Sequence, residues 1–283
     1  MWFSNSENKQ KVIKSKRQAI GNRFSFTKRR RFLLVSLALT VGLFVVQRFP
    51  VESRIYVFGI YGLISYLLCA WSLFRDLRGV SWVSNLILPT LYPVAVGLFY
   101  FLLPQYEVTK IMVAVIFLIS MYALLLTSNI FAVASIRTIQ LLRAARAVGF
   151  LLTVLTAAFL FHFIFSLRVG VLYIFGMSSL VTYPLFLFGI WSYTLGDKLL
   201  GRDLMRALVG TLVVVEVAVA ISFWQIDVSL ISIYLSMIVY VVLGILQHEL
   251  EDRLFARTIQ EYVGFGMLVF GIIVAMVMTR WIG

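Results

Sequence analysis

The chain has 283 residues, of which 61% are hydrophobic and 13% are charged. Soluble globular proteins average about 45–50% apolar and about 25% charged residues, so this composition excludes a water-soluble globule. The apolar residues fall in runs of roughly 18–22, long enough to cross a hydrocarbon core of about 30 Å. Since Cys69 is the single cysteine, an intrachain disulfide is excluded as well. The sequence predicts an integral membrane protein.

Nine apolar runs bounded by charges predict nine membrane-spanning helices and an all-α fold. In chain order the predicted spans are residues 32–47, 55–74, 86–103, 111–130, 148–167, 171–194, 204–223, 228–247 and 263–281. Residues 1–31 form a basic tail on the cytoplasmic side. Because this tail has few large apolar residues, we expect it to be flexible.

The distribution of Lys and Arg predicts the orientation in the membrane. Twenty of these residues lie in the tail and in the loops on its side, against five on the opposite side. By the positive-inside rule the N-terminus is cytoplasmic, and nine spans then place Gly283 outside. We expect a bacterial cytoplasmic membrane as the location.

The net charge of +13 is therefore attributed largely to topology rather than to nucleic-acid binding. The expected partner of the basic tail is the anionic cytoplasmic leaflet, which contributes about 1 kcal/mol per basic residue near the surface. No nucleic acid is expected as a partner. A protein partner or a homo-oligomer stays open.

A long-period duplication is visible in the sequence. Residues 55–66 and 172–183 share Tyr, Phe, Gly, Leu and Tyr at matching positions, and the Arg-Thr-Ile-Gln of residues 137–140 recurs unchanged at 257–260. Such ordered matches at nearly constant spacing are hard to obtain by chance, so we interpret them as an internal repeat.

The repeating unit contains four spans. It covers residues 32–147 and 148–262, and an extra ninth helix follows at 263–283. An even number of crossings returns the chain to the same side, so the two copies are parallel. This predicts a pseudo-two-fold axis along the membrane normal, as in transporters built from parallel repeats.

Arg137 and Arg257 end the fourth and eighth spans at the predicted cytoplasmic mouth. Apolar and polar residues alternate around them at helical spacing, which predicts an elbow helix lying on the membrane surface before the next span. There the two arginines suit a helix C-terminus and lipid phosphates. A regulatory or partner-binding elbow is the alternative.

Two polar residues within predicted spans are candidates for a site in the membrane. Glu216 is the one acid deep in a span, where a charge costs roughly 3 kcal/mol and normally faces a partner or a water-filled cavity. It is interpreted as a buried protonated or hydrogen-bonded acid, as a proton or cation site, or as an exposed residue beyond the true span limit. His162 is the second candidate, with a hydrogen-bonded packing role as its alternative.

Asn129, His248 and Glu249 are further candidates at the cytoplasmic mouth. Asn129 and Glu249 occupy matching places in the two copies, so they are candidates to face each other across the pseudo-axis. The alternative is a polar cluster at the membrane interface with no further role.

The sequence predicts no metal site, no cofactor and no catalytic residues. Two distant histidines and one cysteine leave no metal-ligand spacing, and no nucleophile or phosphate-binding motif appears in a plausible context. We expect a translocator of a small molecule, ion or lipid, with its site between the two repeats. The alternatives are a membrane scaffold or assembly subunit, and a membrane enzyme acting on a lipid-linked substrate.

Overall fold

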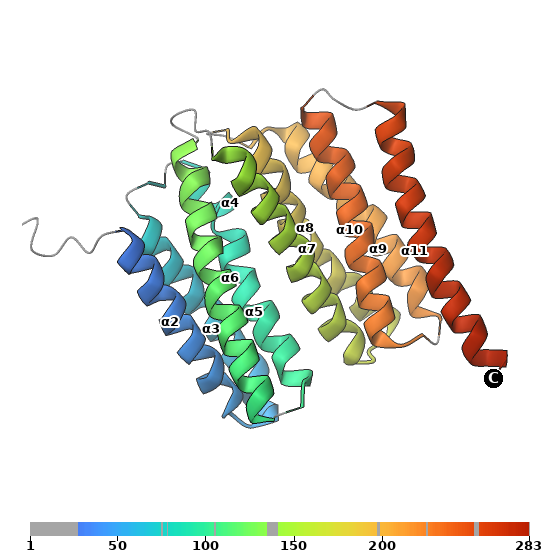
Figure 1. Ribbon diagram of the computed structural model, residues 1–283, viewed down its shortest axis with the longest axis horizontal. Helices are drawn as coiled ribbons and strands as arrows, with labels where there is room; N and C mark the ends of the chain where they lie inside the picture. The colour runs from blue at the N-terminus through green and yellow to red at the C-terminus, as the bar shows by residue number, and fades with distance from the viewer. Residues whose placement is uncertain are drawn as a thin grey trace, which may run out of the picture.

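The structure is a computed structural model that describes residues 28–74, 76–77, 79–104, 106–134, 141–196, 199–224, 226–251 and 255–282. Every regular element in these ranges is a helix (Figure 1). Nine of the helical segments there are long and apolar enough to cross a membrane. The expectation of an all-α, multi-pass integral membrane protein is thereby confirmed.

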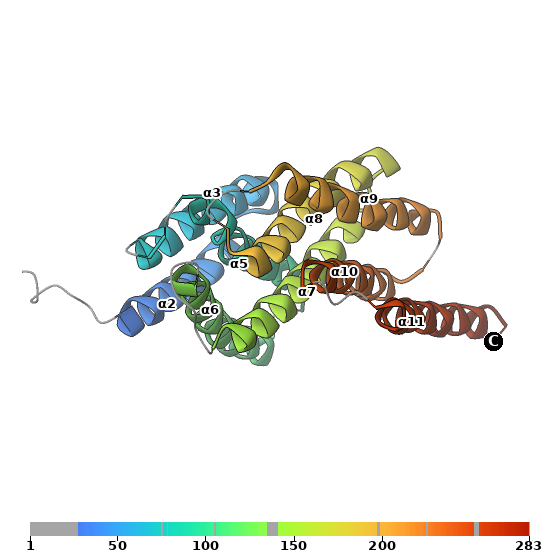
Figure 2. The same ribbon diagram turned by 90° about the horizontal axis from the view of Figure 1, so that it is seen from above.

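The helices form two groups and one peripheral helix (Figures 1 and 2). The first group consists of α2 (Lys28–Gln47), α3 (Val51–Leu73), the short α4 (Ser81–Ser84), α5 (Ile87–Leu102) and α6 (Glu107–Ala134). The second group consists of α7 (Leu142–Ser166), α8 (Val171–Thr194), α9 (Gly201–Ser222) and α10 (Val228–Leu250). The peripheral helix is α11 (Ala256–Ile282).

Successive long helices run in opposite directions, so the loops gather at two ends of the bundle (Figure 1). The basic end is the one at which α2, α5, α7, α9 and α11 begin. Among the described residues it carries Lys28–Arg31, Arg143, Arg146, Arg202, Arg206 and Arg257. The opposite end carries Arg48, Arg54, Lys110, Arg168 and Arg280.

Two helices extend furthest beyond their predicted spans at the basic end. α7 begins at Leu142 rather than at residue 148, and α11 begins at Ala256 rather than at residue 263. The expected elbow helix before the ninth span is wrong as a separate element. Because neither Pro nor Gly interrupts residues 256–263, the helix continues through them. The matching elbow at residues 136–140 lies outside the described residues.

Helix α7 joins the two groups, because it packs against α5 and α6 on one side and against α8 and α10 on the other (Figure 2). Small residues allow this close contact. Ala145 and Gly149 are buried, and a Cβ placed on Gly149 would lie 3.2 Å from the ring of Phe131 on α6 and 3.7 Å from that of Phe188 on α8. Without a hydrophobic drive between helices in lipid, such close packing supplies the association energy.

Several hydroxyl groups inside the bundle donate hydrogen bonds to backbone carbonyl groups. The hydroxyls of Thr153 and Thr156 donate to carbonyls one turn back in α7, at 2.7 and 2.6 Å. Pro93 within α5 has no N–H to donate to the carbonyl of Pro89, and the Ser65 hydroxyl of α3 donates to that carbonyl at 3.2 Å instead. These three hydroxyls are thereby satisfied in the membrane interior without water.

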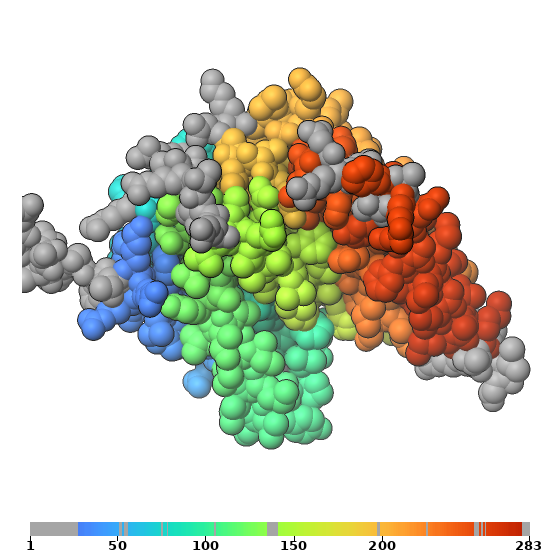
Figure 3. Space-filling view, turned by 45° about the horizontal axis from the view of Figure 1, so that its top comes forward, coloured from blue at the N-terminus to red at the C-terminus, as the bar shows by residue number. Residues whose placement is uncertain are grey.

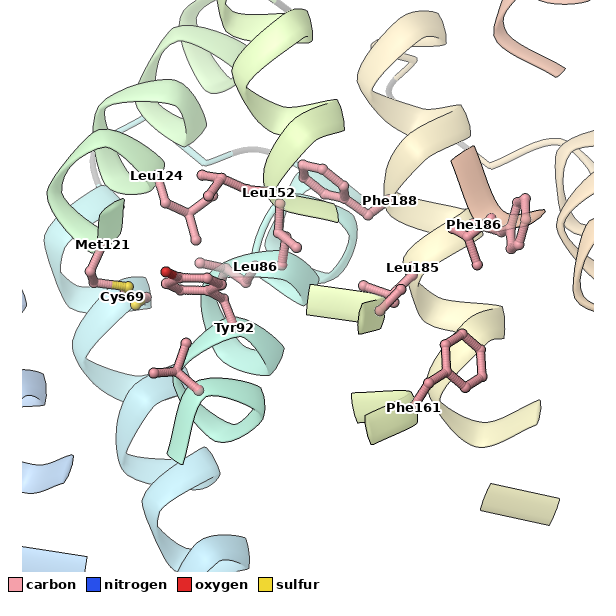
Figure 4. Packing of buried hydrophobic residues seen from close by; sticks show 14 of the residues in the cluster. Cys69, Leu86, Tyr92, Met121, Leu124, Leu152, Phe161, Leu185, Phe186 and Phe188 are labelled. Atoms are coloured by element: carbon pink, nitrogen blue, oxygen red, sulfur yellow. The ribbon is translucent and has the colours of Figure 1, made fainter. Parts of the chain in front are cut away.

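One cluster of buried hydrophobic residues runs through both groups (Figure 4). Tyr92 and Met121 belong to it in the first group, and Phe161 and Phe186 in the second. Helix α11 stands apart from this core. About 6% of its most apolar stretch is buried, against at least 33% in each of the other eight spans, and it packs mainly against α10.

The tight contact at Gly149 predicts that a larger side chain there lowers the stability of the protein. In the Gly149→Leu variant the new side chain must displace Phe131 and Phe188, so we expect a loss of about 1–3 kcal/mol in stability. The midpoint of thermal unfolding in detergent, followed by size-exclusion chromatography after heating, measures this loss. Gly176→Leu is the matched control, because a Cβ on Gly176 meets no atom within 4 Å. An equal drop in both variants would contradict the packing role.

Candidate functional site

A cavity of about 1240 Å³ opens at the basic end between α7, α8, α10 and α11. Its lining combines charged, polar and apolar side chains: Leu142, Arg143, Arg146, Ala147, Phe150, Tyr193, Tyr240, Gln247, His248, Glu251 and Tyr262. Figure 3 brings this end forward and shows α7 and α11 as separate masses at the surface. We call this space the basic-end cavity.

Arg146 is held in place across the basic-end cavity. Its guanidinium Nη1 lies 3.2 Å from Oε1 of Glu251 on α10, and its Nη2 donates to the carbonyl of Tyr193 at 3.0 Å. The guanidinium carbon also lies 4.4 Å from the centre of the Tyr193 ring, within the range of a cation–π contact. These contacts tie the start of α7 to the ends of α8 and α10.

Arg146 and Arg143 each have hydrogen-bond donors that no described residue accepts from. The Nε of Arg146 is buried and has no acceptor there. Arg143, nearly one helical turn earlier on α7, is exposed and forms no ion pair with any described residue. The cavity therefore presents the exposed guanidinium of Arg143 to an incoming acceptor, with Arg146 beside it in the cavity wall.

Rings form the rest of the cavity wall. The ring of Tyr262 on α11 lies 5.5 Å from His248 and 5.6 Å from Tyr240, and Tyr240 lies 5.3 Å from Phe150 of α7. The Nδ1 of His248 is 2.8 Å from the carbonyl of Gly244. Since a carbonyl only accepts, Nδ1 carries a proton, which leaves Nε2 as an acceptor in the neutral ring.

A second ionic cluster lies beside the cavity on α9 and α10. Arg206 bridges Asp203, at 3.4 Å, and Glu249, at 3.1 Å. The carboxylate of Asp203 also accepts the backbone N–H of Leu200, which satisfies one free donor at the start of α9. This arrangement connects the start of α9 to the end of α10 and pairs the charge of Glu249 with that of Arg206.

A further cavity, of about 830 Å³, lies at the opposite end between α8, α10, α11 and the neighbouring loops. We call it the opposite-end cavity. Its lining includes Arg168, Trp224 and Asp227 together with Met276 and Val277 of α11. Each of the two cavities thus combines an arginine and an acid with apolar residues, and α11 contributes to both.

Rings also connect α10 and α11 between these cavities. From the basic end, the contacts pass from Tyr240 to Tyr262 and Phe265, at 5.6 and 6.1 Å between ring centres. Toward the opposite end, Phe270 lies 5.6 Å from Tyr234 and 6.0 Å from Trp224. We call this row of contacts the aromatic seam.

The two intramembrane candidates lie apart from both cavities. Glu216 is exposed on α9, six residues or about 9 Å from the end of that helix, and bonds to none of the described residues. His162 is half-buried, with Nδ1 3.3 Å from the hydroxyl of Ser232 and its ring 5.1 Å from that of Phe99. His162 therefore packs among α5, α7 and α10.

The candidates for a cytoplasmic mouth do not form one cluster. Of these, His248 lines the basic-end cavity, whereas Glu249 bonds to Arg206 beside it. Asn129 lies on α6, on the far side of α7 from α10 (Figure 2), so the structure does not bring it to Glu249. Arg257 is exposed and pairs with Glu261 one turn later on α11. The remaining candidate, Arg137, lies outside the described residues.

The boundary between the two groups holds a smaller cavity, of about 270 Å³, between α5, α6 and α7. Its lining residues include Tyr92, Phe117 and Phe159, and none of them is charged. Within the described ranges, no group of three or more His, Cys, Asp or Glu side chains is placed to hold a metal ion. Charged cavities instead lie beside α11.

Arg143, Arg146 and Glu251 were missed as site residues by sequence reasoning. The two arginines were counted only as determinants of membrane orientation. Their spacing of three residues, which puts both on one side of a helix, was an available signal. The pairing with Glu251 had no signal, because it joins residues 105 positions apart.

The contact between Gly244 and Tyr262 predicts how α11 is held. A Cβ on Gly244 would lie 2.5 Å from the Tyr262 ring, so Gly244→Val should push Tyr262 away and loosen α11. Spin labels on Arg202 of α9 and Arg257 of α11 should then show a longer and broader distance distribution. Gly264→Val is the matched control, since a Cβ there meets no atom within 4 Å. Unchanged distances in Gly244→Val would contradict this role.

The chain was also compared with known proteins. No curated protein and no solved structure matches it. Residues 44–276 match the family DUF5656, whose description is "Protein of unknown function". Since this match covers more than half of the sequence, the chain belongs to the DUF5656 family.

Proposed function

We propose that this integral membrane protein translocates a small amphiphilic molecule between the two sides of the membrane, along α11. The observation that carries the proposal is the pair of cavities at opposite ends of this helix. Each cavity offers charged groups to a polar head and apolar groups to a hydrophobic tail. Ligand pockets of this kind are predominantly apolar with a few placed polar groups.

The weak attachment of α11 supports a path along it. α11 packs mainly against α10, and the aromatic seam runs along that contact from one cavity to the other. Elements that move in function come from the least buried parts of a protein. Separation of α11 from α10 would disturb few buried contacts and would connect the two cavities.

The internal duplication is part of the proposal. In the order A-B-C-D, A-B-C-D, A, helix α11 takes the place in the second unit that α7 takes after the first. α7 packs on both α5 and α6, whereas α11 packs mainly on α10. The second unit is therefore left open where the first is closed, which favours a path beside α11 over one between the repeats.

The proposed orientation has the N-terminus in the cytoplasm and Gly283 outside, in a bacterial cytoplasmic membrane. The charge count supports it, because twenty Lys and Arg residues lie on one side against five on the other. The basic-end cavity then faces the cytoplasm and the opposite-end cavity faces outward.

Reconstitution tests the translocation. In liposomes containing the protein and a fluorescent phospholipid, we expect dithionite to bleach inner-leaflet label that protein-free liposomes protect. Filling either cavity should slow this exchange about tenfold, equivalent to about 1.4 kcal/mol in barrier height. Ala147→Trp fills the basic-end cavity and Val277→Trp fills the opposite-end cavity.

The matched control is Val209→Trp, which adds the same bulk to an exposed residue of α9 that lines neither cavity. It should leave the rate unchanged. No exchange above the protein-free rate in the wild type, with several labelled amphiphiles, contradicts the proposed function. Equal rates of lipid movement across the bilayer in all three Trp variants contradict the path along α11.

Fusion reporters test the orientation separately. Green fluorescent protein at the N-terminus should fluoresce in bacterial cells, because it folds in the cytoplasm. Alkaline phosphatase after Gly283 should be active, because it requires the periplasm. The reverse pattern would contradict the proposed topology without affecting the cavities themselves.

A further inference from the structure

The basic-end cavity has an excess of positive charge at its α7 side. Arg143 and Arg146 lie nearly one turn apart in the first turns of α7, a helix of 25 residues. The positive end of the helix dipole adds to their field, because α7 begins there. Anions are therefore favoured at this wall of the cavity.

Four helices contribute charged or polar side chains to the cavity. From α8 it receives Tyr193, from α10 Gln247, His248 and Glu251, and from α11 Tyr262. Among the described lining residues Glu251 is the one acid, and it bonds to Nη1 of Arg146. Since Arg143 pairs with none of the described acids, this part of the lining retains a positive charge that an anionic ligand would neutralise.

Arg146 is preorganised for an anion. The Tyr193 ring, the Tyr193 carbonyl and Glu251 fix its guanidinium plane in the cavity wall. A fixed guanidinium fork loses little conformational freedom when it binds an oxyanion. Arg143 is exposed and unpaired among the described residues, so it can adjust to the ligand.

The cavity also has an apolar side. Leu142, Ala147 and Phe150 of α7 line it, and α7 does not pack against α11 across it. A ligand that reaches the arginines can therefore keep its hydrophobic part against apolar residues and the bilayer. A volume of about 1240 Å³ exceeds what a free phosphate ion fills, and lies above the usual range of small-molecule sites, about 300–1,000 Å³.

We propose that Arg143 and Arg146 bind the phosphate of an anionic phospholipid headgroup in the basic-end cavity. The phosphate oxygens accept from the guanidinium of Arg143 beside the positive charge of Arg146, and the acyl chains leave between α7 and α11. This inference rests on the proposed function and names the substrate class of its cytoplasmic site.

The matching residue of the first unit supports a single site of this kind. Glu251 corresponds to Phe131 at the spacing that relates the two Arg-Thr-Ile-Gln segments. Phe131 is fully buried, and its ring packs against those of Phe188 and Trp191, at 6.1 and 6.4 Å. In the first unit the aromatic ring of Phe131 therefore occupies the position at which the second unit has Glu251, the acid that bonds to Arg146.

Native mass spectrometry of the detergent-purified full chain tests the binding. The probes are phosphatidylglycerol, phosphatidylcholine, diacylglycerol and inorganic phosphate. We expect retained phosphatidylglycerol, weaker phosphatidylcholine and no diacylglycerol. Arg143→Gln should weaken phosphatidylglycerol binding at least about fivefold, because it removes a charge-assisted contact.

The control is Arg202→Gln, which removes an exposed charge at the same end that does not line the cavity. Arg146→Gln also breaks a contact between helices, so its thermal stability is measured together with its binding. Equal phosphatidylglycerol binding by the wild type and Arg143→Gln would overturn the proposal. Tight binding of diacylglycerol would overturn the phosphate contact, and equally tight inorganic phosphate would overturn the lipid assignment.

The two proposals fail in different experiments. Headgroup-selective binding that depends on Arg143, without exchange in liposomes, supports the phosphate site and contradicts the translocator. Exchange that is unchanged in Arg143→Gln, together with unselective binding, contradicts the phosphate site and leaves the translocator standing.

Discussion

The close approach of α6 and α8 to α7 at Gly149 is the contact on which the arrangement of the helices depends. A Cβ at this position would crowd Phe131 and touch Phe188, so a larger side chain would press on both, and these two residues belong to different groups. Because lipid tails are as apolar as leucine, helices in a membrane associate by close packing rather than by escape from water. A backbone without a side chain at this point lets one helix contact four others, so that the two groups form one bundle.

The position of α11 shows what happens without such a contact. Gly264 and Gly271 offer the same small surface, yet a Cβ on either would meet no atom within 4 Å. α11 instead reaches α10 largely through rings, whose flat faces leave space on both sides. The cavities at its two ends follow from this looser packing, and they place charged groups where they are reachable from the bilayer.

The spans were predictable from the sequence because a backbone in lipid must satisfy its own hydrogen bonds, which permits little besides helix. The helix ends were less predictable, since α7 and α11 continue past their apolar runs into polar sequence at the basic end. The candidate site was predictable only through His248. The rarity of polar residues inside spans points to Glu216, which is exposed on α9. The arginines of the basic-end cavity lie near the ends of spans, where charged residues are common.

Those arginines show why charge counting describes only part of their role. Arg143, Arg146 and Arg202 contribute equally to the positive-inside count, yet of these three only Arg146 is held by a ring, a carbonyl and an acid from neighbouring helices. Whether a residue that orients the chain also binds a ligand depends on the helices packed around it. In the proposed duplication, a change between Phe and Glu at one matching position distinguishes a filled helix contact from a charged cavity. A repeat can thereby keep the same helix arrangement in both copies and develop a binding site in one.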